Sequence, residues 1–169
     1  MSSALRIRRG LFDRLLATDP DAPEGLIQTC SVEQLRDAVA RDLERLLNAR
    51  SALLSDELDT SQLGPHARAS VLCFGVPDFA GRVLASSEDQ RYIATNLARA
   101  IEAHEPRLRQ VAVEFTRSDA SGRALQFTIR ATLVVRPARE SVSFDAVLMP
   151  SMSRYQVTQA RFASAGHRL

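Results

Sequence analysis

The sequence predicts an α+β fold in which N-terminal helices pack on one face of a mainly antiparallel C-terminal β-sheet. Apolar residues recur at helical spacing in the first part of the chain, and they alternate with polar residues after residue 107. Prolines and short polar segments separate the alternating runs, as in a meander of strands. Strict alternation gives each strand one buried and one solvated side, so we expect the helices to cover one face only.

The composition is that of an ordinary globular protein with one domain. The chain has 169 residues, of which 45% are hydrophobic and 25% are charged, and its formal net charge is +2. This weak charge gives no basis for nucleic-acid binding. No apolar run approaches the roughly 20 residues of a membrane span, and no apolar segment follows the N-terminal arginines. We therefore expect neither membrane insertion nor a secretory signal.

We expect the chain to divide into three segments. Residues 1–30 form an arm with a short amphipathic helix at 11–16, followed by a loop rich in Pro and Asp. Residues 31–158 form the single folded domain, and residues 159–169 form a flexible tail.

The first helix of the domain is predicted over residues 32–49. Ser31 and Gln34 have the spacing of a capping box, in which each side chain bonds the backbone N–H of the other residue. The apolar residues that follow share one helical face: Leu35, Val39, Leu43, Leu46 and Leu47.

Two further helices are expected before the sheet. A short helix begins at Pro65 and ends at Gly75, because glycine accepts the backbone conformation of a helix end. A longer helix begins after a capping signal at Ser86 and runs to about Ala103.

Four strands are predicted after the second long helix. Alternating apolar residues mark three of them, at 111–115, 125–135 and 142–148. The fourth strand is short and lies around Tyr155 and Val157.

Glu105, Pro106 and Arg107 are the candidate functional residues, because they lie where the helical pattern changes to the alternating one. Pro106 cannot continue a helix, and it pushes Glu105 toward extended geometry. Residues two apart in an extended segment point to the same side, so Glu105 and Arg107 are expected to form a fixed pair of opposite charges. The pair could tie the helix end to the first strand or form a docking point for another protein. Both roles can hold, because a partly satisfied arginine can still offer donors outward.

The sequence contains no recognisable pattern for catalysis, cofactor binding or metal binding. None of the glycines forms a phosphate-binding loop, and no Gly-x-Ser-x-Gly elbow occurs. The histidines and cysteines share no metal-ligand spacing, so we expect no metal and no cofactor: His66, His104, His167, Cys30 and Cys73.

A glycoside hydrolase would need two carboxyl groups facing each other across a cleft. Glu105 is a candidate for one of them. Arg107 beside it favours the ionised carboxylate, which is the wrong form for a general acid. The candidates for the second group are equally undistinguished: Asp78, Asp89, Glu102, Glu114 and Asp145. We therefore predict that the protein is not an enzyme.

Five motifs occur in an order that resembles a known family. They are Leu-Phe-Asp-Arg-Leu at 11–15, the helical segment 31–50, Ser-Val-Leu-Cys-Phe-Gly-Val-Pro-Asp-Phe at 70–79, Glu-Pro-Arg-Leu at 105–108 and Val-Ser-Phe-Asp at 142–145. This set is similar to TssE, the wedge subunit family of the type VI secretion baseplate, which belongs to the phage tail baseplate wedge proteins once labelled lysozyme-like. The resemblance covers roughly residues 11–157. The sequence departs from it at His104, where an aromatic residue is usual, and at Phe74, where tyrosine is frequent.

The resemblance implies a structural, non-enzymatic role in a contractile machine that delivers effectors. Such subunits sit in the baseplate wedge beside TssF and TssG, with TssK as an indirect partner, in the cytoplasm at the inner membrane. They join the wedge to the sheath proteins TssB and TssC, and the implied mode of contact is strand addition to a β-sheet. Glu105, Pro106 and Arg107 match the triplet regarded as the contact with the wedge core.

Three alternatives stay open at this point. The same fold could serve the baseplate wedge of a phage tail or of another contractile injection system. A related regulatory branch, the IraD-like anti-adaptors, binds a response regulator instead. A peptidoglycan hydrolase is the third alternative. It is disfavoured because Arg107 lies beside Glu105 and no second carboxyl group stands out.

Overall fold

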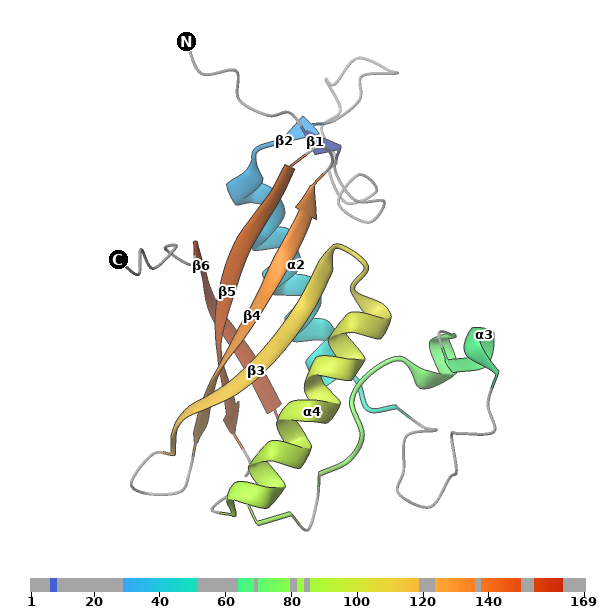
Figure 1. Cartoon of the computed structure of the whole chain (residues 1–169), viewed down its shortest axis with the longest axis vertical. Coiled ribbons are helices and arrows are strands. Elements are labelled where there is room, and N and C mark those ends of the chain that lie inside the picture. The colour runs from blue at the N-terminus through green and yellow to red at the C-terminus, as the bar shows by residue number, and fades with distance from the viewer. Residues whose placement is uncertain are drawn as a thin grey trace.

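The computed structural model of the chain describes residues 7–8, 29–51, 64–68, 70–79, 82–83, 86–118, 124–135, 138–149 and 154–162. The main sheet has four strands. Figure 1 shows the helices α2 (Val32–Asn48) and α4 (Ser87–His104) along one of its faces. Helix α4 packs mainly on strand β3 (Leu108–Ser118), and α2 packs mainly on β6 (Arg154–Phe162). The predicted α+β arrangement, with helices on one face of an antiparallel sheet, is confirmed.

The elements follow one another from helices to strands. The helices are α2 (Val32–Asn48), α3 (Pro65–Arg68), the 3₁₀ helix η2 (Val71–Cys73) and α4 (Ser87–His104). The sheet strands are β3 (Leu108–Ser118), β4 (Leu125–Val135), β5 (Ala138–Met149) and β6 (Arg154–Phe162). Their order in the sheet is β3-β4-β5-β6 with every neighbouring pair antiparallel, which is a simple meander.

Helix α2 confirms the first predicted helix. Ser31 Oγ accepts from the Gln34 backbone N–H at 3.2 Å, and Gln34 Oε1 accepts from the Ser31 N–H at 3.0 Å. The capping box is therefore complete, and two backbone donors at the helix start are satisfied. All five residues of the predicted apolar stripe are buried, and they face the sheet.

The short helix expected from Pro65 to Gly75 is instead two separate turns, α3 and η2. Ser70 divides them. Its hydroxyl donates to the Ala67 carbonyl at 2.7 Å and accepts from the Leu72 N–H at 3.3 Å, so it starts a new turn. A serine side chain that bonds nearby backbone groups competes in this way with a continuous helix.

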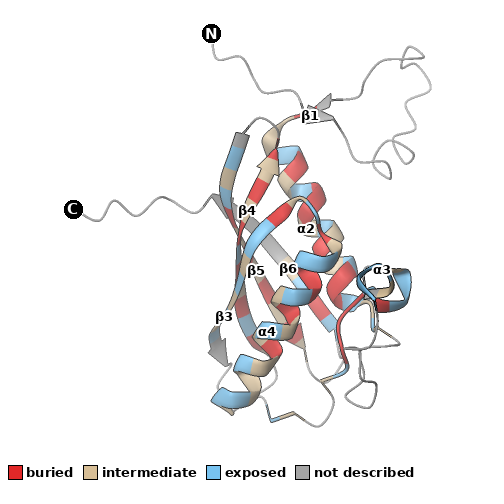
Figure 2. Cartoon of the chain, turned by 45° about the vertical axis from the view of Figure 1, so that its right-hand side comes forward, coloured by how far each residue is buried: buried red, intermediate tan, exposed pale blue. Residues whose placement is uncertain are grey.

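The core lies between the two helices and the sheet. Alternate residues of β4 and β5 are buried on the helix side, and the strand register brings them together in pairs such as Ile129–Phe144 and Phe127–Ala146. Figure 2 shows buried residues on the helices and strands where they face each other. The opposite face of the sheet is polar and carries a Glu114–Arg130 ion pair at 3.0 Å. The predicted division into one buried and one solvated face is confirmed.

The last strand is longer than the short strand predicted around Tyr155 and Val157. It continues to Phe162 because β5 offers backbone partners along its length, with Phe162 opposite Val142. Residues 159–162 of the expected tail therefore belong to the sheet, and the rest of that segment lies outside the described residues.

The arm contains one pairing that the sequence patterns did not predict. Strand β1 (Ile7–Arg8) pairs antiparallel with β2 (Thr29–Cys30), directly before the capping box of α2. The helix predicted at residues 11–16 lies outside the described residues. None of the helices in the described ranges combines the length and the apolar character that a membrane span needs.

Candidate functional site

A turn connects α4 to β3, and it holds the predicted site. Glu105 caps the helix: its N–H donates to the Ile101 carbonyl at 2.8 Å, and its own carbonyl accepts from the Leu108 N–H at 3.0 Å. Pro106 and Arg107 therefore occupy the middle of a tight turn. The extended geometry expected for this stretch is wrong, because the bond from Leu108 back to Glu105 closes the turn first.

The turn brings the Glu105 and Arg107 side chains together all the same. The Arg107 backbone N–H and Nε both donate to Glu105 Oε1, at 3.1 and 2.7 Å, and Nη2 donates to Oε2. Glu105 is 5% exposed and is the only buried charged residue in the described part of the chain. Both of its oxygens are thus bonded to one arginine, as a buried carboxylate requires.

Arg107 also reaches a second carboxylate, which the sequence analysis did not find. Its Nη2 donates to Asp42 Oδ2 at 2.6 Å, and Asp42 lies in the middle of α2. The Arg107 carbonyl accepts from the Val134 N–H of β4 at 2.8 Å. One residue therefore connects the end of α4, the middle of α2 and the sheet. Asp42 belongs to the polar face of α2, and nothing in its spacing indicates a partner 65 positions away.

The two carboxylates keep the Arg107 guanidinium charged. Burial disfavours the cation and by itself would lower its pKa, but the hydrogen bonds and charges of Glu105 and then Asp42 outweigh burial. The pKa of Arg107 is therefore raised above its ordinary value. The cluster thus places one cation between two carboxylates and ties their elements together.

The segment 70–79 lies against the ends of both long helices. The Cys73 carbonyl is 2.9 Å from His104 Nε2 at the end of α4. The Val76 N–H donates to the Ala49 carbonyl at 2.9 Å, just after α2. Gly75 has φ +113°, and a Cβ added there would lie 2.3 Å from the Ala49 oxygen. Glycine is therefore required at this position by both backbone conformation and space.

Phe74 and His104, the two departures from the family pattern, contact each other. Their rings pack edge to face with centroids 5.3 Å apart. The contact joins the 70–79 segment to the residue immediately before Glu105. Two motifs that are separate in the sequence thus form one continuous structural unit around the charged turn.

The described residues contain no group of three or more His, Cys, Asp or Glu side chains that could hold a metal ion. Cys30 and Cys73 are both buried, and they are not joined in a disulfide. The two carboxylates that come together here, Glu105 and Asp42, share a single guanidinium between them. Such an arrangement fastens secondary-structure elements, and it differs from the facing acid and base of a glycosidase.

The described residues form a meander sheet covered by two helices, and the charged turn bonds these elements to one another. The arrangement is that of a structural module, because its motifs hold its own helices and strands together. The model of the family described as "Baseplate wedge protein gp25" matches residues 33–138, which is more than half of the chain. The chain belongs to this family of baseplate wedge proteins. No curated protein and no solved structure matches it.

The matched region begins in α2 and ends at the first residue of β5. It includes the 70–79 segment and Glu105, Pro106 and Arg107, whereas β6 lies beyond it. Membership means a structural role in the baseplate of a contractile injection system, in contact with other baseplate proteins.

Proposed function

We propose that this chain is the non-enzymatic wedge subunit of a type VI secretion baseplate, and that it joins the wedge to the contractile sheath for effector delivery. The observation that carries the proposal is the family match over residues 33–138. The ordered motifs that resemble TssE support the choice of machine. In this proposal the wedge domain is the predicted segment 31–158 together with the rest of β6 to residue 162, and residues 1–30 are an arm. The protein works in the cytoplasm at the inner membrane without a cofactor.

The first contact in the proposal is between the Glu105-Pro106-Arg107 turn and the wedge partners TssF and TssG. The Arg107 side chain is 26% exposed. Its side-chain hydrogen bonds to the described residues come from Nε and Nη2, and Nη1 makes none with them. Pro106 is exposed in the same turn. The turn can therefore brace its own fold and still offer a charged donor to a partner.

The second contact is strand addition by the sheath proteins TssB and TssC, which needs an open edge of the sheet. Helix side chains already occupy part of each edge. On β3, Glu102 Oε1 accepts from the Val111 N–H at 3.0 Å. On β6, Asn48 bonds both the N–H and the carbonyl of Tyr155, at 2.9 and 2.8 Å. Glu44 Oε2 accepts from the Val157 N–H at 3.1 Å.

The far half of β6 is the edge that we assign to the added strand. The Val134 N–H bonds the Arg107 carbonyl and so faces β3. Backbone N–H and C=O groups alternate between the two sides of a strand, so those of the neighbouring residues of β4 face β5. By the same alternation, the backbone groups of Ser143 and Asp145 in β5 face β6. Their partners on β6 are Arg161 and Gln159. By alternation, the backbone groups of residues 160 and 162 face away from β5.

The competing edge, β3, is less regular. Its pairing with β4 has two register shifts, and Gln110 has φ +55°. Irregularities of this kind twist an edge and weaken its ability to accept a further strand.

The proposal is tested by co-purifying the tagged full chain with the TssF, TssG, TssB and TssC homologues of the same genome. Ala160→Pro removes one outward N–H of β6, and Val113→Pro is its matched control on the outer edge of β3. We expect Ala160→Pro to lose the sheath proteins and keep TssF and TssG, and Val113→Pro to keep all four. Loss of the sheath proteins only in Val113→Pro would indicate that β3, and not β6, accepts the added strand. Absence of all four from the wild-type sample would contradict the proposal.

The second candidate function is a baseplate wedge in a phage tail or another contractile injection system. The family description favours it equally, because it names the wedge without naming the machine. The neighbouring genes distinguish the two. A membrane-complex and ATPase set supports type VI secretion, and tail genes support a phage particle.

A further inference from the structure

Four charged side chains form a connected series that leads from the core to the surface. Glu105 bonds Arg107, Arg107 Nη2 bonds Asp42 Oδ2 at 2.6 Å, and Asp42 Oδ1 accepts from Arg45 Nη1 at 3.2 Å. The exposed fraction of the side chain rises along the series, from 7% to 26%, 39% and 63%. The charges alternate in sign, so each group stabilises the next.

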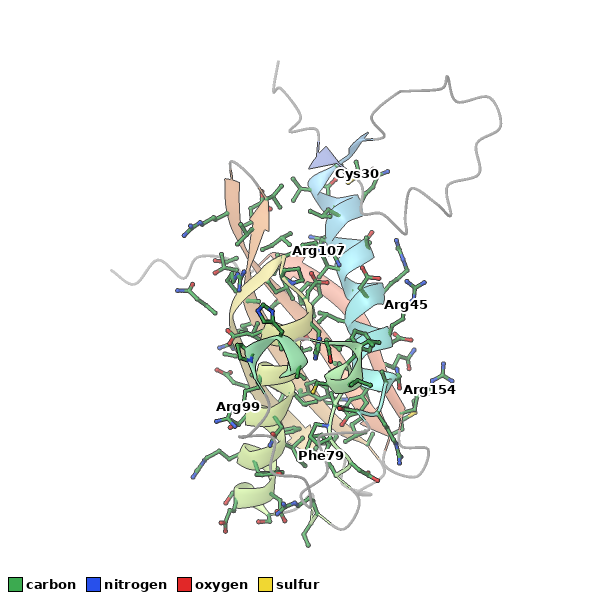
Figure 3. The ribbon with its side chains drawn as sticks, turned by 90° about the vertical axis from the view of Figure 1, so that its right-hand side faces the viewer. Cys30, Arg45, Phe79, Arg99, Arg107 and Arg154 are labelled. Atoms are coloured by element: carbon green, nitrogen blue, oxygen red, sulfur yellow. The ribbon has the colours of Figure 1, made fainter. Side chains whose placement is uncertain are left out.

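The two ends of the series have different capacities for contact. Glu105 is fixed by its own backbone bonds and is almost completely covered, so a partner cannot reach its carboxylate. Arg45 lies in the last turn of α2 and has one hydrogen bond from one nitrogen. Figure 3 shows Arg107 beside α2 and Arg45 projecting from the outer side of that helix. Among the described residues, Arg45 therefore has more free and more exposed donors than Arg107, whose Nη1 alone is unused.

We propose that Arg45 contacts the wedge partner and that Asp42 is a positioning residue for both Arg45 and Arg107. The inference rests on the proposed function, because the partner is taken to be the TssF–TssG wedge core. The group it fits is a carboxylate of that partner. A guanidinium pairs with carboxylates through two parallel hydrogen bonds, and Asp42 takes only one nitrogen of Arg45.

Asp42 is suited to positioning because it uses its two oxygens for two different arginines. Oδ1 holds Arg45 on the same helix, and Oδ2 holds Arg107 from the turn after α4. Loss of its charge would free the Arg45 guanidinium to take other rotamers, and Arg107 would be held by Glu105 alone. The partner would then have to order Arg45 on binding, which lowers affinity.

The test is the affinity of the purified full chain for the co-expressed TssF–TssG homologues of the same genome. Arg45→Glu is expected to weaken binding at least tenfold, and Arg45→Lys less than that, because lysine keeps the charge and loses the two parallel hydrogen bonds. Arg130→Glu is the matched control, because Arg130 is 58% exposed and pairs with Glu114 on the opposite face of the sheet. We expect Arg130→Glu to bind like the wild type.

Asp42→Asn is tested by the salt dependence of the same affinity. We expect a steeper dependence on salt than in the wild type, because the variant has one negative charge fewer beside the arginines, and weaker binding at high salt, where that added attraction is screened and the loss of positioning remains. Binding at high salt equal to that of the wild type would overturn the positioning role.

The outcomes separate this inference from the proposed function. If Arg45→Glu binds like the wild type while Arg107→Lys binds weakly, the contact at Arg45 is overturned and docking at the turn stands. If the wild-type chain does not bind TssF–TssG at all, both are overturned.

Discussion

Arg107 donates from Nε to Oε1 of Glu105 at 2.7 Å, and its guanidinium is the group that holds both oxygens of this buried carboxylate. The pair lies in the tight turn that a backbone bond from Leu108 to Glu105 closes, so it links two adjacent elements, α4 and β3. It also depends on α2 through Asp42. The three residues form a structural tie, and because a docking role is proposed for the same turn, their variants have to be compared by stability as well as by binding.

Replacement of Arg107 by alanine should destabilise the fold by about 3 kcal/mol, because Glu105 would remain buried without a counter-charge. The double variant Glu105→Leu/Arg107→Met should lose less, since it removes both charges and keeps apolar volume. Urea unfolding followed by circular dichroism measures both free energies. If Arg107→Ala stayed within about 0.5 kcal/mol of the wild type, the tie would contribute little to stability.

Gly75→Ala should lower the free energy of unfolding by roughly 2 kcal/mol or more. Two causes act together: the backbone φ of +113°, and the Cβ that would lie 2.3 Å from the Ala49 oxygen. Gly64 is the matched control, because a Cβ added there meets nothing within 4 Å. Thermal unfolding of Gly75→Ala and Gly64→Ala compares the two positions, and equal midpoints would contradict the prediction.

Ser31→Ala should cost about 1 kcal/mol, because the first turn of α2 loses the acceptor of its capping box. Ser87→Ala tests whether any serine at a helix start has this effect. Ser87 is exposed and follows the actual cap of α4, Ser86. Its replacement should change stability by less than about 0.5 kcal/mol. A similar loss in both variants would assign the effect to something other than capping.

Stability should fall as the pH rises above about 10, with Tyr155 as one cause. Burial raises the pKa of Tyr155 above its ordinary value, so the unfolded chain loses this proton first. The contribution of the neutral phenol is complete below the unfolded pKa and is lost as the pH rises toward the folded one. The decline between pH 9 and about 11.5 should be shallower in Tyr155→Phe. Parallel curves for the two proteins would exclude Tyr155 as the cause.

Local sequence patterns predicted the elements that depend on neighbouring residues. The capping box of α2 is an example, because Ser31 and Gln34 satisfy each other within one turn. The apolar stripe of the same helix and the alternation of β4 and β5 predicted which faces are buried. The division of α3 from η2 was missed, because the competing bonds of Ser70 have no distinctive signature in the sequence.

The candidate site was predicted in part. Glu105 and Arg107 could be paired from sequence because only one residue separates them. The reason given for the pairing was wrong: a turn brings them together, not an extended strand. The contact of Arg107 with Asp42 could not be predicted, since it depends on how α2 is placed beside α4 on the same face of the sheet.

The sequence by itself determined the order of helices and strands, the buried faces and the Glu105–Arg107 pair, because each depends on interactions between close neighbours in the chain. Only the tertiary structure decided that Arg107 bonds α2, that Phe74 packs on His104, and that helix side chains occupy parts of both sheet edges. These contacts join residues that the chain keeps far apart. Their geometry follows from packing two helices on one sheet, which no local spacing records.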